Sequence, residues 1–227
     1  MTYTDDITAN VEIISDNREP RCPCLLLLDT SASMSGGPID ELNSGLRLLI
    51  ETISSDALAS LRAEIGIVSF GGQARLIRDF STVDSLDIPS LTANGGTPMG
   101  EAINLGLDAI ESRKKVYNAN GLPYYRPWVF LITDGEPNQA SSLWPVAIQR
   151  VHEFEAGKKI NFFSVGVSSA NTNLLSQLSN EREPLMLQGI NFKELFVWLS
   201  NSMISLSDSK PNDEASLPPV TWAKVGT

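Results

Sequence analysis

Asp29, Ser31 and Ser33 carry oxygen-bearing side chains at alternating positions, directly after the four leucines Leu25–Leu28. A carboxylate and two hydroxyls on one tight turn can point at a single spot, and hard cations such as Mg²⁺ prefer oxygen ligands of this kind. The same residues also suit a turn that Asp29 caps while the serines bond the local backbone. Taken alone, these residues leave both interpretations open.

Two further stretches place polar residues beside the ends of expected strands or helices. In Asn94–Gly100, paired glycines lead into Thr97, and Pro98 then opens a helix, because proline is tolerated at the first helical position. In Trp128–Pro137, an apolar run ends at an aspartate before a turn rich in glycine and proline. Since ligands of open α/β sheets bind outside the carboxyl ends of strands, both stretches are candidates for one site.

The motifs DTSAS, GGTPMGEA and LITDGEP, in this order, resemble a von Willebrand factor type A domain with its metal-ion-dependent adhesion site (MIDAS). The resemblance covers roughly Cys22 to Leu206. It implies a set of metal ligands made of Asp29, Ser31, Ser33, Thr97 and Asp134. Ala32 replaces the glycine that many relatives have, at a position that is not a ligand. The implied ion is Mg²⁺, with Mn²⁺ or Ca²⁺ as alternatives.

Within this family, the stretch RCPCLLLLDTSASMSGGPIDELNSGL is most similar to the bacterial, cytoplasmic TerY/YegL-like branch, which is associated with tellurium resistance and stress response. The resemblance implies a protein–protein interaction module without catalytic activity. Its protein partner would supply a Glu or Asp side chain to the metal. This narrower similarity implies a role in a bacterial stress or tellurite-resistance-type system and says nothing about direct tellurite chemistry.

A Mg²⁺-dependent hydrolase or phosphotransferase is the alternative, because such sites also begin at a strand that ends in aspartate. An aspartyl nucleophile of the DxDxT type needs a second aspartate where Ser31 stands. A serine nucleophile needs a nearby base, and the one histidine, His152, falls in the middle of an expected helix. Neither a lysine-bearing phosphate loop nor a dinucleotide-binding fingerprint is present in the sequence.

The elements that would position these residues alternate between strands and helices. Four consecutive leucines suit a strand that is buried on both faces, as in a parallel sheet. Strands are expected at 23–29, 63–70, 75–80, 128–133, 159–166 and 185–187, and helices at 38–53, after Thr97, at 143–155 and at 191–206. This alternation predicts a doubly wound α/β fold, with a mostly parallel central sheet, one antiparallel edge strand and helices on both faces.

Three segments divide the chain. Residues 1–20 are expected to form an N-terminal arm or edge strand around Val11–Ile14, residues 21–206 the domain, and residues 207–227 a C-terminal tail that docks back on it. The stretch Arg113–Pro127, which holds Tyr117, Tyr124 and Tyr125, is expected to be a surface loop on the side opposite the metal. Its tyrosines are expected to pack on the flank of the sheet, and the mixture of aromatic and basic residues leaves a second partner site as the alternative.

Composition and charge restrict the class of protein. The chain has 227 residues, of which 42% are hydrophobic, and a net charge of −10. This charge argues against nucleic acid and anionic membrane surfaces as partners, because both require basic patches. An expected cytoplasmic location follows from the lack of a signal-peptide pattern and of an apolar run near 20 residues. Cys22 and Cys24 are too close for a disulfide and are expected to pack as small apolar side chains.

Overall fold

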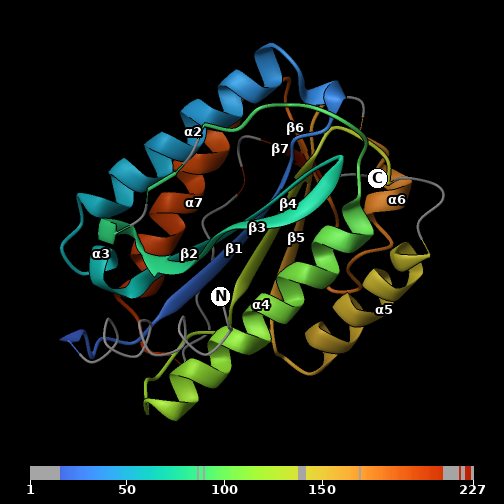
Figure 1. Ribbon diagram of the computed structural model, residues 1–227. Helices are drawn as coiled ribbons and strands as arrows, with labels where there is room; N and C mark the ends of the chain where they lie inside the picture. The colour runs from blue at the N-terminus through green and yellow to red at the C-terminus, as the bar shows by residue number, and fades with distance from the viewer. Residues whose placement is uncertain are drawn as a thin grey trace, which may run out of the picture.

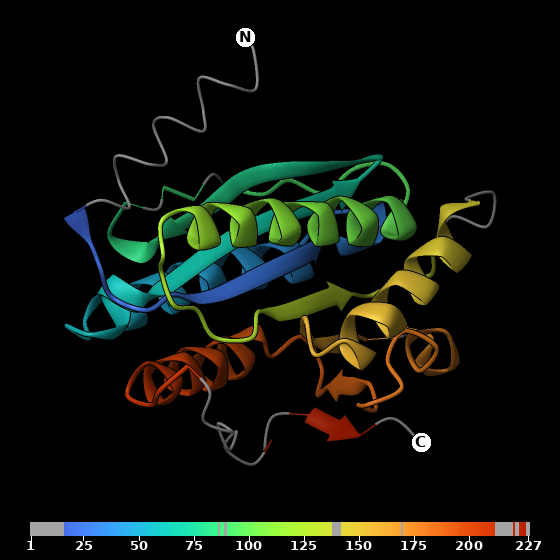
Figure 2. The ribbon, with the colours of Figure 1, turned by 90° about the horizontal axis from the view of Figure 1, so that it is seen from below.

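The computed structural model describes residues 16–85, 87–88, 90–137, 142–168, 170–211, 220 and 223–225. Among these residues, one sheet has the strand order β3-β2-β1-β4-β5-β6-β7 (Figures 1 and 2). The strands are β1 (Cys22–Asp29), β2 (Ala63–Gly71), β3 (Gln73–Thr82), β4 (Trp128–Thr133), β5 (Asn161–Gly166), β6 (Leu185–Leu187) and β7 (Ala223–Val225).

The sheet is mostly parallel, as predicted. Neighbouring strands from β2 through β6 run parallel, and β3 is the predicted antiparallel edge strand. The other edge is occupied by β7, which pairs antiparallel with β6. This strand lies in the C-terminal segment and was not among the predicted strands. Figure 2 shows the β2–β3 hairpin at one edge of the sheet and β7 at the other.

Helices cover both faces of the sheet (Figure 1). The helix pair α2 (Gly37–Ser54) and α7 (Phe192–Ser207) lies on one face, and α4 (Met99–Ala119) and α5 (Leu143–Ala156) lie on the other. Shorter elements are the helices α3 (Ala59–Arg62) and α6 (Thr172–Leu175) and the 3₁₀ turns η1 (Ala32–Met34) and η2 (Val83–Ser85). No helix among the described residues is long and apolar enough to span a membrane.

The four leucines of β1 explain how the sheet is held between two hydrophobic cores. Leu26 and Leu28 belong to the core on the α2 and α7 side, whereas Leu25 and Leu27 belong to the core on the α4 and α5 side. All four side chains are fully buried, as expected when successive residues of a strand point to opposite faces and both faces are covered. The strand therefore holds Asp29 rigidly at its carboxyl end.

Close approach of α2 and α7 depends on Gly45. A Cβ atom at this position would lie 2.3 Å from Cδ2 of Phe196, which is itself fully buried.

The predicted packing of Cys22 and Cys24 is confirmed, since both cysteines are buried in the core on the α2 and α7 side and neither forms a disulfide. Burial raises the pKa of both cysteines far above the usual thiol range, which makes both poor nucleophiles.

The predicted surface loop at Arg113–Pro127 is wrong over its first half, because α4 continues to Ala119. Tyr117 is fully buried and Tyr125 nearly so. Arg113 and Tyr117 of this part of α4 are buried because both donate hydrogen bonds to the buried carboxylate of Glu64. Because Tyr117 and Tyr125 are buried, little aromatic surface is exposed in this stretch for a second partner site. The expected edge strand at Val11–Ile14 lies outside the described residues.

A cluster of buried charged residues lies at the amino end of β2, at the opposite end of the strands from Asp29. Its centre is Glu64, whose carboxylate accepts from Arg21 Nε at 3.0 Å and from Arg113 Nε and Nη2 at 2.7 Å each. Tyr117 donates its hydroxyl to the same carboxylate at 2.5 Å. Exposure is 1% for Arg21 and Glu64 and 6% for Arg113. We call these four residues the Glu64 cluster. It ties β1, β2 and α4 together.

Candidate metal centre

Three loops meet at the carboxyl edge of the sheet: the turn after β1, the glycine-rich loop before α4, and the turn after β4. Main-chain hydrogen bonds join the first two, from Ala32 N to Gly95 O at 2.9 Å and from Asn94 N to Thr30 O at 2.8 Å. Gly95 has a φ of 69°, a left-handed conformation that glycine adopts without strain. The loops are therefore fixed by their own backbones.

The carboxylate of Asp29 is held in one orientation. Its Oδ1 accepts from Ser31 N at 2.8 Å, and its Oδ2 accepts from the Thr133 hydroxyl at 2.5 Å. The side chain is fully buried, and this burial raises the pKa of the Asp29 carboxyl. The hydrogen bonds from Ser31 and Thr133 oppose that rise, while the negative charge of Asp134 adds to it. A nearby cation would relieve the repulsion between the two carboxylates.

The predicted hydroxyl residues connect the first loop to the third. Ser31 Oγ lies 3.0 Å from Ser33 Oγ, and Ser33 Oγ donates to Asp134 Oδ1 at 2.7 Å. Asp29 ends β1 and Asp134 stands one residue after β4, which pairs with β1 in parallel, so both aspartates lie at the carboxyl ends of neighbouring strands. A continuous chain of side-chain contacts thus runs from Ser31 to Asp134.

Gly135 shows where the remaining oxygens converge. A Cβ atom placed on Gly135 would lie 3.5 Å from Thr97 Oγ1, 3.8 Å from Asp29 Oδ2 and 3.9 Å from Ser33 Oγ. Oxygens of three predicted ligands therefore lie around one small space beside Gly135 that a side chain would fill. All five predicted residues, Asp29, Ser31, Ser33, Thr97 and Asp134, are brought together at this edge.

The chemistry of the donors fits a hard divalent cation. The donors are two carboxylates and three hydroxyls, all of them oxygen. Within the described part of the chain, no group of three or more His, Cys, Asp or Glu residues is arranged to hold a metal, so an ion at this edge would depend on the hydroxyls. This use of hydroxyl ligands distinguishes the site from zinc centres, whose ligands are thiolates and imidazoles.

Neighbouring polar residues have other partners. Glu136 is exposed and accepts from Asn171 Nδ2 at 2.8 Å. His152, the base considered for an enzymatic alternative, contacts the main-chain oxygen of Gln177 at 2.9 Å. Met99, two residues after Thr97, is buried in the core on the α4 and α5 side.

Sequence reasoning missed Thr133. This residue ends β4 and is fully buried. Its hydroxyl donates to Asp29 Oδ2 and accepts a hydrogen bond from Gly135 N at 3.1 Å. It therefore positions both the first carboxylate and the third loop. A polar residue at the end of the apolar run Trp128–Ile132 was the available signal, since a buried hydroxyl needs a partner.

Gly135→Ala is expected to weaken metal binding without disturbing the fold. The added methyl group would make ordinary contacts of 3.5 Å or more, yet it would occupy the space that the oxygens surround. We expect at least a tenfold loss of Mg²⁺ affinity by titration calorimetry, comparable to the effect of disturbing a metal site from its surroundings (roughly 10–100-fold). Unchanged affinity would place the ion elsewhere. Gly37→Ala, on α2, is the matched control.

Comparisons with known proteins agree with this arrangement. The sequence profile of the von Willebrand factor type A domain matches residues 25–195. An uncharacterized protein of Synechocystis sp. is 26% identical over 200 residues, which cover 82% of this chain and 43% of that protein. The chain thus spans less than half the length of this curated relative.

Solved structures share the fold at low sequence identity. The PilB minor pilin from Streptococcus sanguinis has a TM-score of 0.61 at 15% identity, covering 84% of this chain and 62% of that one. The pilus adhesin SpaC from Lactobacillus rhamnosus GG has a TM-score of 0.63 at 12% identity, with coverages of 84% and 31%.

A third structure carries a metal. Proximal thread matrix protein 1 from the mussel byssus, described with a zinc-occupied MIDAS motif, has a TM-score of 0.55 at 16% identity, covering 82% of this chain and 48% of that one. The profile match extends over more than half of the chain and includes the strands and loops that carry the oxygen cluster. The chain therefore belongs to the von Willebrand factor type A domain family.

Proposed function

We propose that this protein is a metal-dependent protein–protein interaction module whose divalent ion binds an acidic side chain of a partner. Asp29, Ser31, Ser33, Thr97 and Asp134 would hold the ion, directly or through water. The observation that carries the proposal is the convergence of Thr97, Asp29 and Ser33 oxygens around Gly135, next to the hydrogen bond between Ser33 and Asp134.

Mg²⁺ is the proposed ion, with Mn²⁺ and Ca²⁺ as alternatives, because all five side chains offer oxygen. The zinc-occupied MIDAS motif of the mussel protein supports a divalent ion in this type of site. When bound, the ion supplies an electrophilic position that a carboxylate can complete. Where Asp29 and Asp134 act through water and do not bind the ion directly, their two negative charges neutralise the dication incompletely, so it attracts a Glu or Asp of the partner.

A binding role is favoured over catalysis by the surroundings of the hydroxyls. Ser33 donates to Asp134 and the only histidine is engaged with Gln177, so no imidazole stands ready to activate a serine. The names of the similar structures describe a matrix protein, a pilin and an adhesin. We further propose a cytoplasmic, TerY/YegL-like setting in stress response or tellurium resistance, which rests on the resemblance of the first metal loop and its flanks.

Partner capture from native lysate tests the function. The immobilised protein is presented with Mg²⁺ and again with EDTA, and Thr97→Ala is compared with Thr97→Ser, which keeps the hydroxyl. We expect one protein to be retained by the wild type and by Thr97→Ser in Mg²⁺, and to be lost with EDTA or with Thr97→Ala. A partner held equally in all four conditions would remove the metal from the interface and contradict the proposal.

A further inference from the structure

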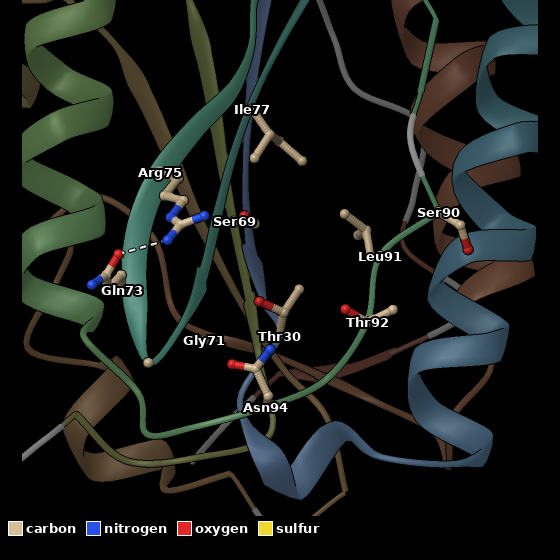
Figure 3. A pocket seen from close by; sticks show the side chains of 11 residues that line it. Thr30, Ser69, Gly71, Gln73, Arg75, Ile77, Ser90, Leu91, Thr92 and Asn94 are labelled. Atoms are coloured by element: carbon tan, nitrogen blue, oxygen red, sulfur yellow. Dashed lines mark hydrogen bonds between the residues drawn. The ribbon is translucent and has the colours of Figure 1, made fainter.

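Figure 3 shows a polar groove whose lining includes Thr30, the residue after the proposed ligand Asp29. It has a volume of about 510 Å³. Small residues of β2, Ser69 and Gly71, lie along its base, and Gln73, Arg75 and Ile77 of β3 form one wall. The β3 residues alternate along the strand, so their side chains share one face of the sheet.

The opposite wall is the segment that leads to Thr97. Leu91 and Thr92 face the β3 side chains across the groove in Figure 3. This wall is anchored to α2, because Asn43 donates to Leu91 O at 2.9 Å and accepts from Leu91 N at 2.8 Å. Asn43 is 8% exposed, so the anchor is protected from water. These two hydrogen bonds hold the groove wall at Leu91 against α2.

One end of the groove opens at the metal edge. Thr30, the residue after Asp29, and Asn94, just before Thr97 along the chain, both line it. Arg75 pairs with Ser69, and Ser69 pairs with Leu28, the residue before Asp29. Two strand spacings, about 10 Å in all, thus separate Arg75 from the β1 backbone near Asp29. An extended peptide covers that distance in about three residues.

The charge of the groove indicates what it accepts. Among the described lining residues, Arg75 carries the only charged side chain. Its guanidinium donates to Gln73 Oε1 at 2.8 Å, and no carboxylate pairs with it in the described part of the chain. Elsewhere the chain is acidic, with a net charge of −10. An exposed guanidinium without a carboxylate partner, in an acidic protein, is suited to an anionic group.

We propose that this groove binds the extended segment that flanks the metal-bound carboxylate of the partner, and that Arg75 pairs with a second acidic side chain on it, about two to four residues away. This inference rests on the proposed function and adds the sequence requirement of the partner. The metal selects one carboxylate, and the groove selects an acidic peptide of defined spacing. A single acidic residue on a rigid surface would satisfy the metal alone.

Short blocked Gly/Ser peptides test this spacing. Each peptide carries one glutamate, followed at increasing distance by a second glutamate or, in its matched control, by glutamine. Binding to the isotope-labelled protein in Mg²⁺ and in EDTA is followed by amide NMR shifts. For the best spacing we expect the doubly acidic peptide to bind about two- to fivefold more tightly than its control, as one exposed ion pair allows. The amides of Gly72 and Thr92 are expected to shift.

Three variants make the result decisive. Arg75→Gln is expected to remove the preference for the second glutamate while Mg²⁺-dependent binding of both peptides persists. Thr92→Trp, which fills the groove from its exposed wall, is expected to do the same. Arg47→Gln, an exposed arginine of α2 outside the groove, should keep the preference.

The outcomes separate the two proposals. If Arg75→Gln retains the full preference, or if the shifts avoid Gly72 and Thr92 while Mg²⁺ dependence persists, the groove assignment is wrong and the metal function stands. If neither peptide binds in a Mg²⁺-dependent manner to the wild type, the proposed function fails and this inference fails with it.

Discussion

Asp134→Ala is expected to lower the affinity for Mg²⁺ by at least about 100-fold, because loss of a ligand should exceed the roughly 10–100-fold effect of changes around metal ligands. The substitution removes one of the two carboxylates at the proposed site and the acceptor of the Ser33 hydroxyl. Titration calorimetry with Mg²⁺ and electron paramagnetic resonance with Mn²⁺ measure the loss. Glu51→Ala, which removes an exposed carboxylate of α2, should leave both affinities unchanged.

Thermal unfolding provides an independent test of the loss of Mg²⁺ binding in Asp134→Ala. A ligand that binds only the folded state stabilises it, by about 2.7 kcal/mol when its concentration is 100 times the dissociation constant. The wild type should therefore unfold at a higher temperature in Mg²⁺ than in EDTA, and Asp134→Ala should show no difference. Asp134 is only partly buried, so both proteins should unfold alike in EDTA. A wild-type response to Mg²⁺ in Asp134→Ala would contradict the ligand assignment.

Glu64→Gln is expected to destabilise the protein by about 3–5 kcal/mol, the range found when one member of a buried ion pair is removed. Glutamine keeps nearly the volume of Glu64 but leaves Arg21 and Arg113 without a carboxylate in a buried environment. Its amide would also present hydrogen atoms to guanidinium donors. Urea-induced unfolding measures the change in free energy.

Two comparisons identify the cause of that loss. Tyr117→Phe removes one hydrogen bond to Glu64 and should cost only about 1–2 kcal/mol. Replacing Arg21, Glu64 and Arg113 together by methionine, leucine and methionine should recover much of the lost stability, because apolar residues of similar volume avoid the desolvation of charges. A loss below about 1 kcal/mol for Glu64→Gln would show that water reaches the cluster.

Substitutions in the Glu64 cluster should change the stability of the fold without changing metal binding. Glu64 and Gly71 lie near opposite ends of β2, about 23 Å apart at the rise of an extended strand. Folded Glu64→Gln protein should therefore bind Mg²⁺ with wild-type affinity. The two largest predicted effects thus act on different properties of one chain.

Much of the fold could be predicted because the signals are local. The leucines of β1 and the apolar run of β4 mark buried strands, and each is followed by an aspartate that lies at the carboxyl edge of the sheet. The strand at 185–187 and the helix after Thr97 were also placed correctly. In each case, composition within a few residues determines the structure.

The features that could not be predicted depend on contacts between distant residues. Arg113 and Tyr117 look like loop residues until Glu64, about fifty positions earlier, is placed beside them. The groove requires Asn43 to hold Leu91, which lies 48 residues away. The strand β7 depends on pairing with β6, and its sequence, Ala223–Val225, is too short to carry a pattern.

The main-chain hydrogen bonds between the metal loops limit which residues near the metal site and the groove can be substituted. Gly71 has no room for a side chain, because a Cβ atom there would lie 2.1 Å from Thr30 O. Ser90 and Thr92, by contrast, are exposed on the groove wall. Substitutions there can alter which peptide is recognised and leave the ion-binding loops in place. Descendants of one ancestral chain could thus acquire new partners while inheriting the same inorganic chemistry.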